Sequence, residues 1–497
     1  MQRGAAVMTP ATSVFLPMVG EGDWAAALEV LDRHWVEIWF AVDPVDLREI
    51  LAEAPGHLLA SLRNADSIAG ALGHRCAGVR HPGVLPHEAA SLPDVARTVT
   101  RLRLQERPVA AMAHVPGALA VYRAQRGRLV DATGGEAALW LVQVATTALL
   151  AGEVAAAQGI LLSAVDVHET PRFPFVLRYV TAERALTLAV GGNVAEARHV
   201  VRQGYAMPRT GSWVESVVDR VLWLADFICA VDTLDERTEE MRLDNPSPLS
   251  HRELWPVALL AHVRYLTLTG RPQLAEELCD AVAAVDLAAA DADGLFASAV
   301  ADARLLVRPQ RGDAGPEDRA SVAQTVLARA LRLFVTGQFA AVTRLTLPRT
   351  HDNRLVRAMA LLRAQATIAQ GRAREGQQLL LETLHEVLDC QTYSVLTYLT
   401  RESLDAIGET DPGARAAELV ERHSLPLVRV GATLTAALTK AETAVLRLLC
   451  DGLTREEIAK ELFLSVNTVK THLRSAYRKL GVTHRVEALE ASAQLGI

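Results

Sequence analysis

Residues 438–480 read LTKAETAVLRLLCDGLTREEIAKELFLSVNTVKTHLRSAYRKL, and this stretch decides how the C-terminal part of the chain folds. Thr439 with Glu442 and Thr454 with Glu457 have the spacing of a capping box. In that motif the threonine hydroxyl accepts from a backbone N–H at the helix start, and the glutamate accepts from the threonine N–H. Ser465 is suited to cap a further helix. The stretch therefore predicts at least three consecutive helices.

The connection between the second and third of these helices is very short. Only residues 462–465 separate them, which requires a sharp turn between two packed helices. A weaker helix start follows at Thr483. The stretch thus predicts a compact four-helix unit with a helix-turn-helix at its centre.

The third predicted helix has two chemically different faces at about 100° per residue. The apolar face holds Val469, Leu473, Ala476 and Leu480, and the opposite face holds Asn467, Lys470, Thr471, Arg474 and Arg478. Residues 466–485 contain five lysines or arginines and no acidic residue. Such a surface suits a polyanion.

Double-stranded DNA is the partner that this face predicts. Lys470 and Arg474 can donate to guanine edges, and Thr471 can contact a thymine methyl group. Contacts to phosphate are expected from Thr454, Asn467, Thr468 and Arg478. The alternative is a solvated charged face, which most charge runs are. Caps, turn length, apolar face and charge sign agree independently, and this agreement favours DNA.

The spaced positions of this stretch resemble the LuxR-type DNA-binding domain of bacterial transcription regulators. They include Gly452-Leu453-Thr454, Glu457-Ile458-Ala459, Asn467-Thr468-Val469-Lys470-Thr471-His472 and Lys479-Leu480-Gly481-Val482. The resemblance implies a DNA-binding domain over residues 437–497 with its recognition helix in the major groove. Tyr477 stands where the family more often has an aliphatic residue.

The resemblance also implies that the last helix, from Thr483 to about Gln494, serves dimerisation, as it often does in the family. Val486, Leu489 and Ala493 recur there at helical spacing. They either form the contact of a homodimer on DNA or only cover the core of the helix-turn-helix.

The charge of the chain is divided unevenly. The formal net charge is −7, but residues 437–497 hold nine Lys or Arg and seven Asp or Glu, against 42 and 51 in the preceding part. The small domain is weakly basic and the large part is acidic. Five cysteines without a close pair support neither a metal site nor a disulfide framework, and they fit a reducing cytoplasm. No apolar stretch is long enough to predict a membrane helix.

Lysine is confined to the C-terminal domain. The four lysines are Lys440, Lys460, Lys470 and Lys479, so the first 439 residues contain none. A Walker A loop and a Schiff-base site each require a lysine. The large part is therefore expected to hold neither, and no catalytic constellation or cofactor site is predicted.

The large part has a recurring pattern of a helix, a turn with glycine and a second helix. The turns begin at Gly22, Gly152, Gly192, Gly270, Gly337 and Gly371. The later glycines are separated by one or two periods of 34 to 40 residues, a spacing typical of tetratricopeptide-like helical pairs. The pattern predicts an all-α helical-repeat solenoid. An irregular helical bundle with chance glycines is the alternative.

Composition places the expected boundaries. Residues 1–20 are read as a loose leader, 21–125 as an N-terminal helical segment, 126–424 as the tetratricopeptide-like repeat domain and 425–436 as a linker. The large part resembles the helical-repeat sensor region of MalT-like regulators. Such regulators commonly begin with an ATPase module, which is not expected in this chain.

These observations predict a cytoplasmic bacterial transcription regulator that is not an enzyme. The repeat region is expected to sense a ligand or a partner protein, and RNA polymerase or another protein is considered as a further partner. The alternative is a protein-interaction scaffold with a vestigial DNA-binding domain. Tryptophans in the repeats could line a ligand groove, but packing between helices is the favoured reading.

Overall fold

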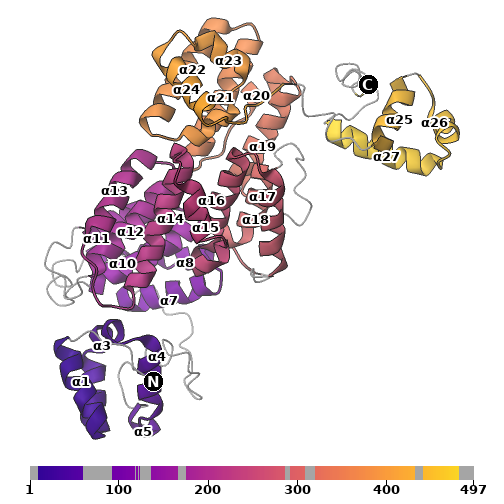
Figure 1. The fold of residues 1–497 in the computed structure, drawn as a ribbon. Helices are drawn as coiled ribbons and strands as arrows, with labels where there is room; N and C mark the ends of the chain where they lie inside the picture. The colour runs from indigo at the N-terminus through magenta and orange to yellow at the C-terminus, as the bar shows by residue number, and fades with distance from the viewer. Residues whose placement is uncertain are drawn as a thin grey trace. The chain divides into compact units, whose positions relative to one another are not determined.

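The computed structural model describes residues 9–59, 92–117, 119–120, 122–123, 136–165, 175–285, 291–307, 320–430, 440–450, 452–480 and 488. Every regular element in these ranges is a helix (Figure 1). The prediction of an all-α protein is confirmed for them. None of the helices in these ranges is long and apolar enough to span a membrane. The chain divides into two units, the first comprising residues 1–229 and 288–296 and the second residues 230–287 and 297–497.

The first unit begins with a cluster of short helices. They are α1 Pro10–Glu21, α2 Trp24–Arg33, α3 Trp35–Ala41, α4 Pro44–Ala52 and α5 Gly56–Leu59. Phe15 of α1 is fully buried in their shared core. The buried Glu37 carboxylate accepts a hydrogen bond of 2.9 Å from the Ala11 N–H at the start of α1, where the helix dipole favours an anion. The prediction of a loose leader over residues 1–20 is therefore wrong from Pro10 onward.

The rest of the first unit consists of packed helices. They are α7 Leu92–Leu104, α8 Pro108–Met112, α10 Glu136–Leu150, α11 Val154–Val165, α12 Phe175–Val190, α13 Val194–Ala206 and α14 Glu215–Thr233. Both α7 and α8 pack against α10, and the buried Arg103 donates to the Gln143 carbonyl at 2.7 Å. Helix α7 thus packs with helices beyond the boundary predicted at residue 125.

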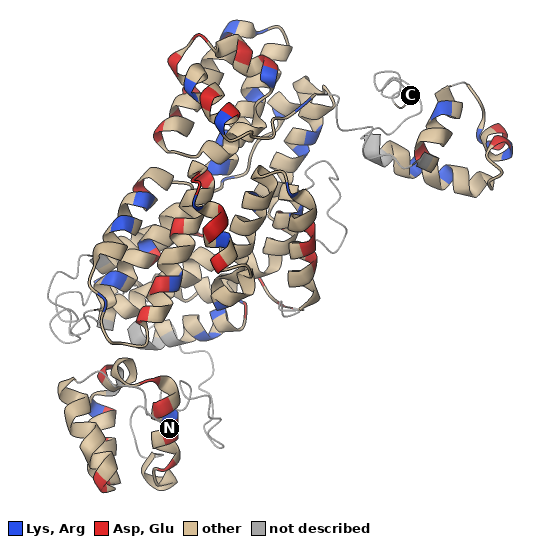
Figure 2. Ribbon diagram, in the orientation of Figure 1, with Lys and Arg blue, Asp and Glu red and all other residues tan. Residues whose placement is uncertain are grey.

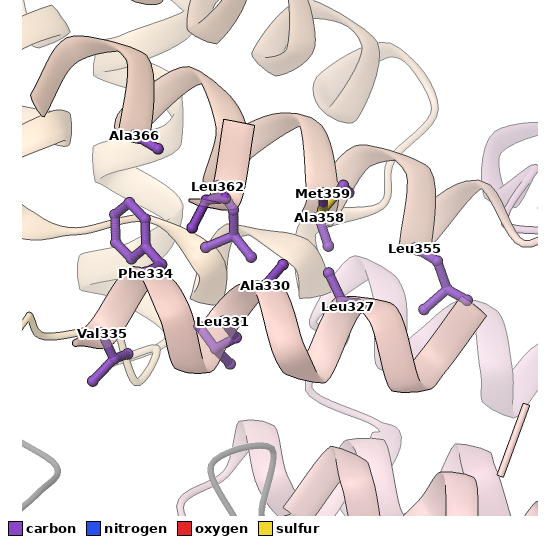
Figure 3. Packing of buried hydrophobic residues seen from close by; sticks show 11 residues of the cluster. Leu327, Ala330, Leu331, Phe334, Val335, Leu355, Ala358, Met359, Leu362 and Ala366 are labelled. Atoms are coloured by element: carbon purple, nitrogen blue, oxygen red, sulfur yellow. The ribbon is translucent and has the colours of Figure 1, made fainter. Parts of the chain in front are cut away.

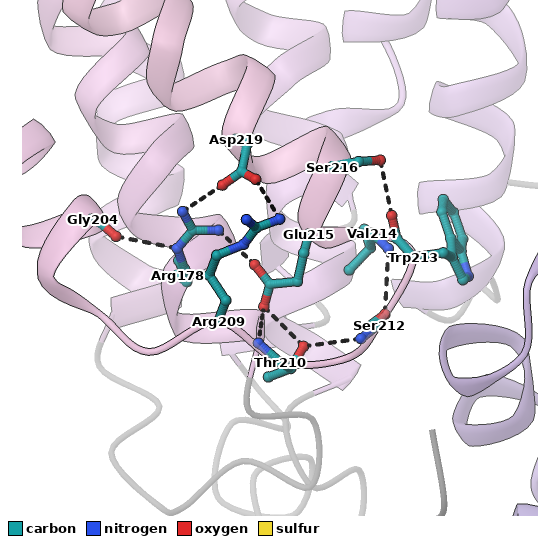
Figure 4. Close-up of polar contacts among 10 residues, drawn as sticks. All are labelled: Arg178, Gly204, Arg209, Thr210, Ser212, Trp213, Val214, Glu215, Ser216 and Asp219. Atoms are coloured by element: carbon teal, nitrogen blue, oxygen red, sulfur yellow. Dashed lines mark hydrogen bonds and ion pairs between the residues drawn. The ribbon is translucent and has the colours of Figure 1, made fainter. Parts of the chain in front are cut away.

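An ion-pair network joins α12 to the first turns of α14 (Figure 4). Arg178 donates to Glu215 at 2.5 Å and to Asp219 at 2.6 Å, and its Nε donates to the Gly204 carbonyl at 3.2 Å. Glu215 also accepts from the Thr210 N–H at 2.8 Å. Burial acts to lower the pKa of Arg178, but the hydrogen bonds of Asp219 and Glu215 outweigh it, and the pKa is raised. The guanidinium is therefore held as a cation.

The second unit continues the helical pattern as far as residue 430. Its helices are α15 Thr238–Asp244, η1 Pro248–Leu254, α16 Trp255–Leu268, α17 Pro272–Ala284, α18 Gly294–Val307, α19 Val322–Val335, α20 Phe339–Arg344, α21 Asn353–Ala369, α22 Ala373–Asp389, η2 Tyr393–Tyr398, α23 Arg401–Ile407 and α24 Asp411–Arg422. The first residues of α18 belong to the first unit. Figure 3 shows the apolar core between α19 and α21, with Phe334, Leu331 and Leu362 packed together.

The glycine turns predicted from the sequence are present. Gly22, Gly152, Gly192, Gly270, Gly337 and Gly371 all have positive φ, between 68° and 85°. Each of them joins two consecutive helices that pack against each other. A left-handed residue ends a helix and reverses the chain, which is the arrangement that a helical-pair repeat requires. Between α15 and α16 the chain forms only the short helix η1, inside which Arg252 has φ 51°.

The connection after α24 differs from the predicted linker. Ser424 has φ 49°, and the Leu425 N–H donates to the Val420 carbonyl at 3.0 Å, so the chain turns sharply back. Leu425 is buried, and the Val428 N–H donates to the Leu399 carbonyl at 3.0 Å. Residues 425–430 therefore lie against the helical unit. Residues 431–436 of the predicted linker are outside the described residues.

Candidate DNA-binding surface

Three described helices form the C-terminal domain around one apolar core. They are α25 Lys440–Cys450, α26 Arg455–Glu461 and α27 Val466–Leu480, and each packs against the other two. The buried residues of the core are Val445, Leu446, Leu449, Ile458, Ala459, Val469, Leu473 and Ala476. Ala488, the described residue of the predicted fourth helix, is helical and fully buried.

The capping box of α26 has the predicted geometry. The Glu457 N–H donates to Thr454 Oγ1 at 3.3 Å, and the Thr454 N–H donates to Glu457 Oε2 at 2.7 Å. The hydrogen bond from the Thr454 backbone and, to a smaller extent, the one from its side chain lower the pKa of the Glu457 carboxyl group. Gly452 has φ 89°, and the turn before the helix closes with a hydrogen bond of 3.1 Å from the Leu453 N–H to the Leu448 carbonyl. The first residue of the other predicted box, Thr439, lies outside the described residues.

The turn between α26 and α27 has an unusual residue. Phe463 has φ 55°, its side chain is 96% exposed, and its N–H donates to the Lys460 carbonyl at 3.3 Å. The Leu464 N–H donates to the Ala459 carbonyl at 2.9 Å. This pair of bonds is the helix ending in which glycine is the usual left-handed residue. A phenylalanine carries no local signal for positive φ, so this conformation of Phe463 could not be predicted from the sequence.

Ser465 caps α27 as predicted. The Thr468 N–H donates to Ser465 Oγ at 3.0 Å, and the hydroxyl groups of Ser465 and Thr468 lie 2.8 Å apart. Thr468, a predicted phosphate contact, is thus also part of the cap.

The two faces of α27 are separated as the sequence predicts. Val469, Leu473 and Ala476 are buried, whereas Asn467, Lys470, Thr471 and Arg474 are exposed. No residue of α27 is acidic, while the acidic residues of the other two helices include Glu456, Glu457 and Glu461 on α26 (Figure 2). The hydroxyl of Thr471 donates to the Asn467 carbonyl at 2.9 Å.

Among the other predicted site residues, Thr454 is exposed. The backbone of Arg478 belongs to α27, but its side chain lies outside the described residues, as do Val486, Leu489 and Ala493. Tyr477, which departs from the family pattern, packs partly buried against the core.

The family model described as bacterial regulatory proteins, luxR family, matches residues 436–491. Residues 436–491 form a luxR-family regulatory domain. The match contains all three described helices and the turn at Phe463. The helix-turn-helix resemblance stated for residues 437–497 is therefore confirmed, with the matched luxR-family domain ending at residue 491.

The chain is also similar to the HTH-type transcriptional regulator MalT of Klebsiella pneumoniae subsp. pneumoniae. The two are 33% identical over 120 residues, which are 24% of this chain and 13% of that protein. The chain thus spans about an eighth of the length of this relative. No solved structure matches the chain.

Proposed function

We propose that the chain is a bacterial transcription regulator that binds promoter DNA through its luxR-family domain. The observation that carries the proposal is the exposed face of α27, where Lys470 and Arg474 lie opposite the buried Val469 and Leu473. A helix of this kind, held by a second helix across a sharp turn, presents its exposed side to the major groove. The helical-repeat region senses a ligand or a partner protein.

The residues of α27 divide between bases and phosphates. Lys470 and Arg474 donate to base edges in the major groove, and Thr471 contacts a thymine methyl group. The Thr471 hydroxyl is used within the helix, which leaves its methyl group for this contact. These three residues therefore select the sequence.

The phosphate contacts fix the position of the domain on the duplex. They come from Thr454, Asn467, Thr468 and Arg478. Thr454 precedes α26, and Asn467 and Thr468 lie in the first turn of α27. The helix dipole favours an anion such as phosphate at a helix start.

The DNA-bound form is a homodimer on two half-sites, assembled through Val486, Leu489 and Ala493. The supporting feature is their helical spacing in the segment that the resemblance assigns to dimerisation. Mass measurement of residues 430–497 with a two-half-site duplex tests this step. A one-to-one complex at saturation would count against it.

The chain is not an enzyme and acts in the cytoplasm, where bacterial DNA lies, with RNA polymerase or another protein as a further partner. In particular it does not bind ATP, because residues 1–439 contain no lysine for a phosphate loop. Isothermal titration of the intact chain with ATP is expected to give no heat of binding. Micromolar affinity would show this part of the proposal to be wrong.

Selection from a pool of random duplexes tests the proposed function. The intact chain is expected to enrich one sequence motif over successive rounds, and a Lys470→Ala/Arg474→Ala double variant is expected to enrich none. Unchanged pool composition with the unmodified chain would instead favour an interaction scaffold whose DNA-binding domain is vestigial.

A further inference from the structure

The second unit contains a groove of about 950 Å³ beside the end of α21. Its apolar lining residues, called the floor below, are Phe334 of α19, Phe339 of α20, and Ile368 and Ala369 of α21. The lining also contains residues 424–430, called the wall below, and residues 400–403 at the start of α23, called the rim. No residue of this groove was predicted as a site.

The floor is an extension of the apolar core. The rings of Phe334 and Phe339 meet edge to face at 5.4 Å, and Phe334 packs within the core drawn in Figure 3. Ala369 in the last turn of α21 is exposed. Phe334 itself is buried, so the apolar surface open to a ligand comes from the half-buried Phe339 and Ile368 and the exposed Ala369.

A buried glutamine holds the rim in place. Gln365 is 3% exposed, and its Nε2 donates to the Leu361 and Tyr398 carbonyls at 3.0 and 2.9 Å. Its Oε1 accepts from the Thr400 N–H at 2.8 Å. These bonds fix the chain before α23 against α21, so the rim is a preformed part of the fold.

The wall is the chain that leads toward the luxR-family domain. The turn at Ser424, the buried Leu425 and the Val428 hydrogen bond to Leu399 hold it against the helical unit. Val428 also packs against the same core as Phe334. The first helix of the luxR-family domain begins at Lys440, ten residues after Val430. A molecule in the groove would therefore contact the segment that leads from the helical unit to the luxR-family domain.

The charged groups of the lining favour an anion. The lining contains two guanidinium groups, of Arg401 and Arg429, and one carboxylate, of Glu402; all three residues are exposed. The ion pair of Arg401 with Glu421 is long, at 3.6 Å, and exposed, and such pairs contribute little. A guanidinium binds a carboxylate or sulfonate through two parallel hydrogen bonds.

We propose that this groove is the effector site of the chain, and that it takes a small molecule with an apolar body and one anionic group. Binding against residues 424–430 changes the affinity of the luxR-family domain for DNA. The proposal rests on the proposed function for its second step. Its first step, binding of the small molecule in the groove, does not depend on whether the chain binds DNA.

The probe for the first step is 8-anilinonaphthalene-1-sulfonate, an aromatic anion whose fluorescence rises in apolar sites. The intact chain is titrated beside Ala369→Trp, which fills the groove from an exposed position, and Ala414→Trp, a matched change on an exposed position of α24 outside the groove. We expect Ala369→Trp to weaken binding about tenfold or more and Ala414→Trp to bind like the unmodified chain. Circular dichroism checks that both variants fold.

A second pair of probes tests the charge. An Arg401→Gln/Arg429→Gln variant should bind the sulfonate about tenfold less tightly than the unmodified chain does. N-phenyl-1-naphthylamine has the same aromatic body without the charge, and its affinity for the variant and for the unmodified chain should be equal. Equal affinity of Ala369→Trp and the unmodified chain for the sulfonate would overturn the site. Equal loss for both probes in the arginine variant would overturn the anionic class.

The coupling step is measured as the dissociation constant of a selected duplex with and without the sulfonate. A change of about threefold or more in the unmodified chain, absent in Ala369→Trp, supports it. Unchanged DNA affinity with the groove filled would overturn the coupling. A chain that binds no duplex at all would refute the proposed function, and with it the coupling, while the titration of the groove would still decide the site.

Discussion

Replacing Arg474 by alanine separates sequence reading from general attraction to DNA. Arg474 is exposed and lies one turn beyond Lys470, on the side of α27 opposite Leu473 and Ala476. Truncation therefore removes no core contact, and the free energy of unfolding is expected to change by less than about 0.5 kcal/mol.

The expected loss on DNA is much larger. A base-edge contact of an arginine is worth about 1 to 3 kcal/mol of discrimination, which is about 5- to 150-fold in affinity for a selected duplex. A scrambled duplex offers no such contact, so its affinity should fall far less. The assay is a fluorescence anisotropy titration of both duplexes at several salt concentrations.

Two further arginine variants serve as controls. Arg447→Ala removes an exposed arginine of α25 and should leave discrimination unchanged. Arg478→Ala should weaken the binding of both duplexes alike and lower the slope of log affinity against log salt concentration by about one. If Arg474→Ala kept full discrimination and reduced only the salt slope, the assignment of Arg474 to base edges would be refuted.

Three other predictions concern stability. Phe463→Gly should raise the unfolding free energy of residues 430–497 by about 1 kcal/mol, because glycine adopts the left-handed conformation without the cost that a side chain carries; a decrease in a calorimetric scan would contradict this. Arg178→Met should lower the free energy of unfolding, measured in urea, by about 3 kcal/mol, because it leaves the buried Glu215 without its ion pair. A decrease of less than about 1 kcal/mol would show that the ion pair is dispensable. Burial lowers the pKa of His262 despite its hydrogen bonds to the Ala258 and Asn245 carbonyls. Below about pH 6.5 the unfolded state therefore binds more protons than the folded state, and the free energy of unfolding decreases as the pH is lowered. In His262→Gln the slope should be shallower by up to about 1.4 kcal/mol per pH unit, and identical slopes would exclude His262 as a contributor.

Local signals in the sequence were sufficient for several helix ends. The caps at Thr454 and Ser465 and the glycine turns at Gly152 and Gly371 depend on side chains within a few residues of each other. The two faces of α27 follow from helical periodicity alone. The predicted contacts of Lys470, Thr471 and Arg474 with DNA stay predictions.

Long-range packing decided the parts that the sequence did not reveal. Helix α1 contains Pro17 and has little pattern of its own, but it is held by Glu37, 26 residues away, and by the burial of Phe15. Residues 425–430 have no periodicity, yet the Val428 N–H donates to the Leu399 carbonyl, far back along the chain. Spacing along the chain carries no information about such contacts.

Sequence reading by α27 is tested by the ratio of the affinities of the intact chain for its selected duplex and for a scrambled duplex of the same composition. The selected duplex is expected to bind at least about a thousandfold more tightly at physiological salt, with both affinities falling as salt rises. Equal affinities at every salt concentration would contradict the claim that the exposed face of α27 reads a DNA sequence.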